Sequence, residues 1–263
     1  MNAKRPSPWV DRLAHLGNFA AFAWGAARGL PGAVRRPGAA CRELYHMLLG
    51  TLPVALVAGA ALGVVTWLQL HGLLSRFQSV EWLPQALAVA VVWELGPITA
   101  GLIAAGRIGA GLGAELGSMR LTEQLDAVAV LGVSPLRRLV APRVLACIVA
   151  LPLLTIFVDY VALGSAFGAE FLGGSMNWTQ YLTECLRHLR WGDVIPATLK
   201  TVVFGYLIGV AGCFCGAEAT GGTEGVGRAA TRAVVWSTLL VLLSDVLLVR
   251  LIQIGQGLVS GEW

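Results

Sequence analysis

The chain has 263 residues, of which 56% are hydrophobic and only 13% are charged. An average soluble domain carries about 25% charged residues, and a soluble protein as apolar as this one would precipitate. These values predict an all-α integral membrane protein with no soluble globular domain beside its spans. The formal net charge of +4 does not indicate a nucleic-acid partner, because the basic residues flank hydrophobic runs instead of covering one soluble face.

Residues 1–43 are predicted to form a cytoplasmic N-terminus with an amphipathic helix over residues 9–28. The apolar positions of this helix follow helical spacing: Trp9, Leu13, Leu16, Ala20 and Ala27. The polar positions lie on another face: Asp11, Arg12, His15 and Asn18. Such a helix lies in the plane of the lipid headgroups. The alternative is a signal peptide, since Lys4 and Arg5 precede an apolar stretch, but the polar residues interrupt its hydrophobic region.

Five long runs with few charges predict five transmembrane helices, since about 20 apolar residues cross a bilayer. They cover about residues 44–74, 82–106, 144–169, 194–217 and 233–258. Fourteen Lys and Arg residues flank one side of these spans and three flank the other. Because cytoplasmic flanks carry the excess of basic residues, we expect the N-terminus in the cytoplasm and the C-terminus outside.

Small residues recur in and beside these runs. Glycines four residues apart predict close contacts between helices, at positions 59/63, 109/113/117, 164/168, 205/209 and 212/216. The five cysteines, at positions 41, 147, 185, 213 and 215, have neither paired nor metal-binding spacing. They are interpreted as small apolar packing residues.

Ionisable groups inside the hydrocarbon cost several kcal/mol unless they are paired or hydrated. With a helical rise of about 1.5 Å per residue, Glu94 and Asp245 lie near mid-membrane. Lys200 and Asp159 reach a common level nearer the external surface, where they are positioned to pair. Arg250 is interpreted as an anchor at the external end of its span. Glu94 and Asp245 either fix helix packing alone or form a polar spot in a substrate cavity, and we prefer the cavity.

The segment between the second and third spans, residues 107–143, mixes charged and apolar residues in a helical rhythm. It has the signals of a short helix: a capping residue, two carboxylates in the first turn, and a glycine and a proline at the end. These residues are Thr122, Glu123, Asp126, Gly132 and Pro135. A loop that only connects two spans needs no capped helix with an apolar face. The segment is therefore predicted to be a lever for a partner, in preference to a solvated loop.

The sequence has no recognisable ATP site or catalytic constellation. Its only lysines are Lys4 and Lys200, and neither stands in a P-loop pattern, so an ATPase would be a separate chain. No Gly-x-Ser-x-Gly or His-Glu-x-x-His pattern occurs, and the four histidines lie at span ends or in loops. An enzyme is therefore disfavoured, and no cofactor or metal is expected in this chain.

Several short motifs occur in order along the chain. They are Glu94-Leu95-Gly96-Pro97, Ala105-Gly106-Arg107-Ile108-Gly109, Ala114-Glu115-Leu116-Gly117-Ser118-Met119-Arg120, Thr122-Glu123-Gln124-Leu125-Asp126-Ala127, Pro142-Arg143-Val144-Leu145-Ala146, and residues 219–228 with 231–235. With these motifs the chain resembles the MlaE/YrbE permease family over roughly residues 40–255.

The resemblance implies a permease domain over residues 44–263, in the bacterial inner membrane, as one subunit of an ATP-binding-cassette (ABC) transporter. Such transporters move phospholipids or related lipids between the inner membrane and the outer envelope and maintain the lipid asymmetry of the outer membrane. The permeases are homodimers. They work with a cytoplasmic ATPase that holds ATP and Mg, often with a small STAS-domain protein, and with periplasmic MCE-domain proteins.

The resemblance also suggests roles for residues. The intramembrane charges would line the substrate pathway: Glu94, Asp159, Lys200 and Asp245. The segment at about 115–135 would be the coupling helix seated in the ATPase, with Arg120, Glu123, Gln124, Asp126, Gly132 and Pro135.

One residue departs from the family pattern. Many members carry a basic residue directly before the glutamate of the Glu-Leu-Gly-Pro motif, where this chain has Trp93, so the charge of Glu94 depends on whether Lys200 or water reaches it. Two other functions stay open. One is a proton-coupled secondary transporter of a hydrophobic substrate with Glu94, Asp159 and Asp245 as the relay. The other is a membrane scaffold that transports nothing.

Overall fold

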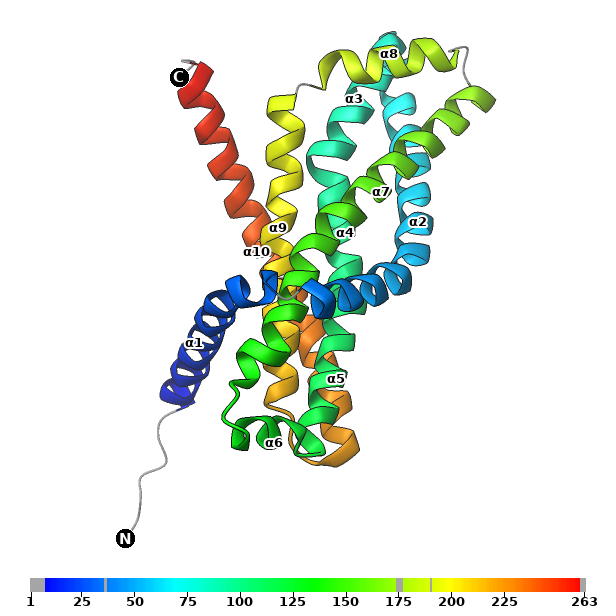
Figure 1. The fold of residues 1–263 in the computed structure, drawn as a ribbon. Coiled ribbons are helices and arrows are strands. Elements are labelled where there is room, and N and C mark those ends of the chain that lie inside the picture. Colours follow the sequence, from blue (N-terminus) through cyan, green and yellow to red (C-terminus); the bar gives the residue numbers. More distant parts are fainter. Residues whose placement is uncertain (1–7, 36, 174–176, 190, 261–263) are drawn as a thin grey trace.

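The computed structural model describes residues 8–35, 37–173, 177–189 and 191–260, and every regular element in these ranges is a helix (Figure 1). Five helices are long and apolar enough to cross a membrane. They cover Pro37–Arg76, Val80–Leu121, Leu136–Gly173, Val194–Ala217 and Gly222–Gly255. The predicted fold class is confirmed. Most of these helices begin before the predicted apolar run, because the added residues include Glu, Arg and Ala, which continue a helix beyond the hydrocarbon as readily as large apolar residues do.

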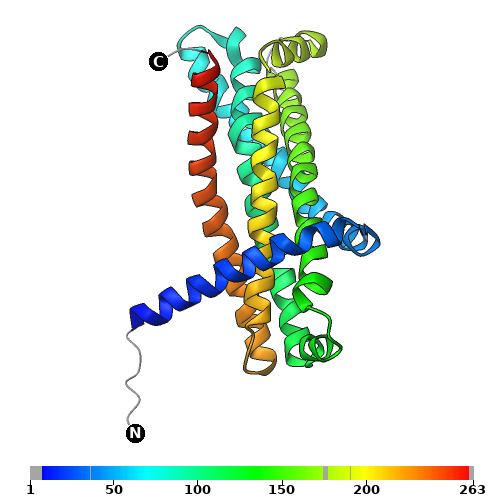
Figure 2. The same cartoon turned by 60° about the vertical axis from the view of Figure 1, so that its left-hand side comes forward.

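The first helix, α1 (Pro8–Val34), runs across the side of the bundle, at a large angle to the long helices (Figure 2). This direction agrees with the predicted interfacial helix. Aromatic residues hold it in place, because the rings of Phe19 and Phe22 lie 5.3 and 5.5 Å from the ring of Phe214. The Tyr206 hydroxyl also donates a hydrogen bond of 2.8 Å to the backbone carbonyl of Ala23.

The second helix, α2 (Pro37–Arg76), starts across the bundle and then turns along it (Figure 1). Pro53 lies inside this helix, and a proline lacks the N–H that would bond the preceding turn. The first part of α2 thus runs across the bundle at the same level as α1, and its second part is the first transmembrane span.

The second span is one long helix in consecutive pieces. After a short 3₁₀ turn, η1 (Val80–Trp82), come α3 (Leu83–Ala90), α4 (Gly96–Ala104) and α5 (Ala110–Leu121). Single π-helical turns, η2 (Val91–Leu95) and η3 (Ala105–Gly109), join these pieces. Pro97 explains the first of them, because its ring displaces the carbonyl four residues before it and a wider turn relieves the clash. The predicted motif glutamate, Glu94, lies in this turn.

After α6 (Gln124–Val130) and a π turn, η4 (Leu136–Val140), the chain forms the central helix α7 (Ala141–Gly173), which packs on α2 and α9 (Trp191–Ala217). Glycines permit these contacts, as predicted. A Cβ on Gly63 would collide with the backbone of Ala162, and one on Gly205 with the backbone of Cys147. The pair at 164 and 168 is an exception, because open space surrounds both positions.

The remaining elements are α8 (Trp178–His188), which lies across the end of the bundle opposite α6, and α10 (Gly222–Ser260) (Figure 1). The turn from α9 to α10 needs glycine, because Gly221 and Gly222 have φ angles of +92° and +71°. Toward its C-terminus α10 diverges from α9 (Figure 1). The outer side of α10 is apolar and exposed, at Val235, Leu239, Leu243, Val246, Leu247 and Leu251.

Four of the five cysteines are buried, as the packing interpretation predicts: Cys147, Cys185, Cys213 and Cys215. Cys41 is exposed on the transverse part of α2, so the packing interpretation is wrong for this residue. Cys147 shows the packing role directly, because its Sγ lies 3.7 Å from the Sδ of Met47 on α2.

Candidate functional site

Three charged side chains meet inside the membrane-spanning part of the bundle. Lys200 on α9 donates a hydrogen bond of 2.8 Å from Nζ to Oε2 of Glu94. The same Nζ lies 3.0 Å from Oδ1 of Asp245 on α10, as an ion pair without hydrogen-bond geometry. Lys200 and Asp245 are buried, whereas the Glu94 side chain is 39% exposed. We call these residues the Lys200 cluster. It joins three helical segments through one cation.

The Lys200 cluster borders a small cavity of about 80 Å³ where α10 diverges from α9. Apolar side chains form most of its other walls, including Trp93, Val249 and Ile252. Three of the four residues predicted for the substrate pathway thus lie together: Glu94 and Lys200 line the cavity, and Asp245 contacts Lys200. At about 80 Å³ the cavity is too small to hold a whole lipid, but its lining of charged and apolar side chains suits contact with a molecule that carries both a polar group and hydrocarbon.

The fourth residue, Asp159, does not join the cluster, so its predicted pairing with Lys200 is wrong. The prediction relied only on the similar depth of the two residues in the membrane. The long Lys200 stem instead reaches Glu94 and Asp245, while Asp159 packs against Gly96, where a Cβ would meet its Oδ1 atom. Oδ1 of Asp159 is buried and has no hydrogen-bond partner among the described residues.

The second group of predicted residues lies at the opposite end from α8, where a sharp turn joins α5 to α6. Arg120 Nη1 bonds Oδ1 of Asp126 over 2.6 Å and ties the two helices together across this turn. Within α6, Leu125 is buried and Gln124 is exposed. The end of the segment is apolar and open, with Val130 87% and Leu131 78% exposed. A short helix is thus held rigidly with an uncovered apolar tip.

Details of this turn differ from the prediction. Thr122 does not cap α6, because its hydroxyl donates to the carbonyl of Ser118 at the end of α5. The N-cap position is Glu123, in the left-handed conformation with φ of 58°. Gly132 follows the helix with φ of +74°, as expected of a terminating glycine.

The predicted helix at 115–135 is also divided differently. Residues up to Leu121 belong to α5, and Pro135 precedes the η4 turn instead of ending α6. A short helix, α6, lies within the predicted segment. The sequence signals do not reveal that the first residues of that segment belong to the end of the preceding span.

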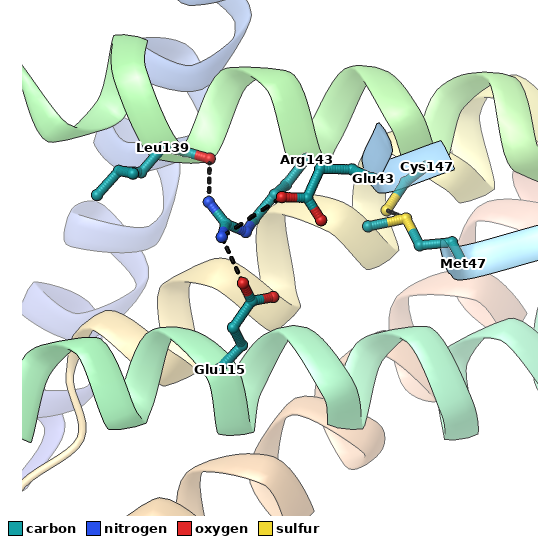
Figure 3. Close-up of polar contacts among 6 residues, drawn as sticks. All are labelled: Glu43, Met47, Glu115, Leu139, Arg143 and Cys147. Atoms are coloured by element: carbon teal, nitrogen blue, oxygen red, sulfur yellow. Dashed lines mark hydrogen bonds and ion pairs between the residues drawn. The ribbon is translucent and has the colours of Figure 1, made fainter. Parts of the chain in front are cut away.

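Sequence reasoning missed a second buried cation, Arg143 at the start of α7 (Figure 3). Its Nη2 lies 2.5 Å from Oε1 of Glu115 on α5 and 3.5 Å from Oε1 of Glu43 on α2, and its Nη1 donates to the Leu139 carbonyl over 2.8 Å. We call these residues the Arg143 cluster. The sequence held a signal for part of this cluster, because Glu115 and Arg143 both belong to the family motifs. Glu43 could not have been found in this way, because only the packing of α2 brings it to Arg143.

A buried acid near the other end of α7 was also missed. Glu170 accepts a hydrogen bond of 2.7 Å from the indole Nε1 of Trp67 on α2, and both side chains are buried. The predicted third span ends one residue earlier, so Glu170 was not counted among the intramembrane charges. An indole donor satisfies one lone pair of a buried carboxylate without introducing a second charge.

Comparison with known proteins identifies the family. The profile of the permease MlaE matches residues 40–251, which is most of the chain. The chain belongs to the MlaE permease family. The MlaE motifs include Glu94 of the Lys200 cluster, both Glu115 and Arg143, and the turn before α6. The sequence-based resemblance is therefore confirmed.

Three relatives show the breadth of the MlaE family. A probable ABC transporter permease protein of Rickettsia prowazekii is 37% identical over 210 residues, 80% of this chain and 81% of the relative. The intermembrane phospholipid transport system permease protein MlaE of Haemophilus influenzae is 30% identical over 251 residues, 94% and 95% of the two chains. The chloroplastic protein TRIGALACTOSYLDIACYLGLYCEROL 1 of Arabidopsis thaliana is 34% identical over 209 residues, 79% of this chain and 59% of the plant protein. The chain is accordingly a multi-pass membrane permease of the ABC transporter type.

Proposed function

We propose that this permease is the membrane subunit of an ATP-driven transporter that moves phospholipids between the inner membrane and the periplasmic side, so that the asymmetry of the outer membrane is maintained. The observation that carries the proposal is the Lys200 cluster beside a cavity with apolar walls, in a member of the MlaE family. A phospholipid carries a charged headgroup and hydrocarbon chains, which match these two kinds of surface. The names of the relatives from Haemophilus and Arabidopsis both refer to lipids.

The energy is proposed to come from a separate cytoplasmic ATPase that binds ATP and Mg and receives α6. Val130 and Leu131 support this assignment, because exposed apolar residues on a rigid end outside the bilayer mark a contact with another protein. Arg120 and Asp126 would position α6, since they pair with one another, while Glu123 and Gln124 are free to face the partner.

Membership of the MlaE family supports a proposal for the rest of the assembly. We propose a homodimer whose two copies enclose a common lipid cavity, with a STAS-domain protein on the ATPase and an MCE-domain protein in the periplasm. The exposed apolar side of α10 beside the Lys200 cluster is a suitable surface for the second copy.

Coupling to the ATPase is tested by placing a charge on the tip of α6. We expect Val130→Asp combined with Leu131→Asp to abolish copurification of the ATPase and ATP-dependent lipid transport into acceptor vesicles. Leu186→Asp, a change at an apolar residue on α8 that is 65% exposed, is the matched control and should preserve both. If the double variant transports lipid at the control rate, α6 is not the coupling element.

The proposed orientation, with the N-terminus in the cytoplasm, is tested by labelling with a membrane-impermeant maleimide near pH 7. Cys41 is exposed near the start of α2 and should react in inside-out vesicles but not in intact spheroplasts. A cysteine introduced by Thr183→Cys on α8 should show the reverse pattern. Cys185, also on α8, should stay unlabelled on both sides, because burial raises the pKa of its thiol to about 11. Labelling of Cys41 from outside would invert the topology.

A further inference from the structure

A second cavity lies far from the Lys200 cluster along the bundle, at the bend of α2. It has a volume of about 380 Å³, is open on one side, and is bounded by α2, η3 and α5. This volume falls within the range of about 300–1,000 Å³ that is common for ligand sites. The polar residues that line it are Glu43, His46, Arg107 and Glu115, and Gly50 and Gly111 leave room between them.

The charges around this cavity are of both signs. Arg107 is exposed and makes no ion pair with the described residues, and its guanidinium lies over Gly50, where a Cβ would approach Nε to 3.6 Å. Glu43 and Glu115 each contact Arg143 through Oε1. Arg143 does not line the cavity, but it contacts both carboxylates. Counted with it, two guanidinium groups and two carboxylates sum to zero, so the site favours a ligand with both a positive and a negative group over a simple anion.

An apolar surface continues from the cavity along α2. Val54 and Val57 follow Gly50 by four and seven residues, which places them on the same helical face, and both are exposed. The transverse parts of α1 and α2 run across the bundle at one level (Figures 1 and 2), as expected at the boundary between headgroups and hydrocarbon. The first part of α2 supplies Glu43, His46 and Gly50 to the cavity, which therefore lies at this boundary. A charged recess at this boundary with an apolar surface on one side matches the shape of a lipid.

We propose that the cavity binds the headgroup of a zwitterionic phospholipid of the cytoplasmic leaflet, with a primary ammonium group as in phosphatidylethanolamine. The phosphate lies at Arg107 and His46, the ammonium donates to Glu43 and Glu115, and one acyl chain runs along Val54 and Val57. The role of this site in transport rests on the proposed function, whereas the binding itself does not.

The test is native mass spectrometry of the purified full chain titrated with phosphatidylethanolamine, phosphatidylcholine and phosphatidylglycerol. We expect phosphatidylethanolamine to bind at least about tenfold more tightly than the other two, because phosphatidylcholine has no ammonium proton to donate and phosphatidylglycerol has no cation. Inorganic phosphate at millimolar concentration should not displace the lipid, since it satisfies only Arg107 and His46.

Two variants locate the bound lipid. Gly111→Leu places an apolar side chain at the wall of the cavity, where no atom lies within 4 Å of a Cβ, and Gly164→Leu is the matched control at a glycine outside the cavity whose Cβ position is equally open. Arg107→Gln removes the phosphate ligand, and Arg42→Gln is the control at an exposed arginine of α2 that does not line the cavity. We expect each cavity variant to weaken phosphatidylethanolamine binding about tenfold or more, and each control to leave it unchanged.

Equal retention of the three lipids, or loss of binding in the controls to the same extent as in the cavity variants, means annular lipid only and overturns the proposal. Displacement by inorganic phosphate alone also overturns it, in favour of an anion site. The transport assay is scored separately. Transport without selective binding leaves the proposed function intact, and selective binding without ATP-driven transport removes the function but not the site.

Discussion

Lys200 and Arg143 are both buried cations held between two carboxylates from other helical segments, but their surroundings differ. Arg143 lies at the start of α7, and its planar guanidinium contacts two carboxylates and a backbone carbonyl at once. Lys200 lies within the bundle as a point charge, and one of its partners, Glu94, faces a cavity. An arginine fork fixes the geometry of several partners, whereas an ammonium on a flexible stem can exchange one partner for another. The comparison indicates that Arg143 joins its helices rigidly, whereas the ion pair between Lys200 and Glu94 can open and re-form.

The largest effect on stability is expected from Arg143→Leu. This change leaves Glu43, which is 17% exposed, and Glu115, which is 44% exposed, without their shared cation. Breaking a fully buried pair costs about 3–5 kcal/mol, and because Glu115 can be hydrated we expect a loss of about 3–4 kcal/mol. Thermal unfolding in detergent measures the loss, and Arg42→Leu on the exposed side of α2 is the control. A change no larger than that of the control would show that the Arg143 cluster is not a joint.

A smaller loss of stability but a complete loss of transport is expected from Lys200→Met. Asp245, which is 6% exposed, loses its cation, whereas Glu94 is 39% exposed and can be hydrated from the cavity, so we expect a cost of about 2–3 kcal/mol. The neutral combination Lys200→Met, Glu94→Gln and Asp245→Asn should regain stability to within about 1 kcal/mol of the original protein, since no charge then stays unpaired. Lipid transport into acceptor vesicles should stay absent. Normal transport by the neutral combination would contradict a role for the charges.

The smallest effect is expected from Asp159→Asn, because no described residue forms an ion pair or a hydrogen bond with the buried Oδ1 atom of Asp159. Stability should change by less than about 1 kcal/mol, and transport should stay close to that of the original protein. Asp245→Asn, which removes a partner of Lys200, is the contrasting variant. Loss of transport in a stable Asp159→Asn protein would favour the proton-coupled transporter that the sequence leaves open.

The candidate site could be predicted only in part. Glu94, Lys200 and Asp245 stand out in the sequence because charges are rare within apolar runs, and the structure brings them together. The pairing of Lys200 with Asp159 was wrong, because depth along a helix does not tell which way a side chain faces. Thr122 was assigned to the wrong helix end, since a threonine before a carboxylate fits both a cap and the last turn of the preceding helix.

The sequence by itself determined the membrane location, the five spans, the short helix α6 and the family, because hydropathy, charge asymmetry and ordered motifs are properties of the linear chain. Only the tertiary structure decided which charges share a cation. Glu43, Glu115 and Arg143 are far apart in sequence, and their attraction matters only after α2, α5 and α7 have packed and excluded water. The same holds for the cavity at the bend of α2, whose walls come from separate helices and whose charges are balanced only in space.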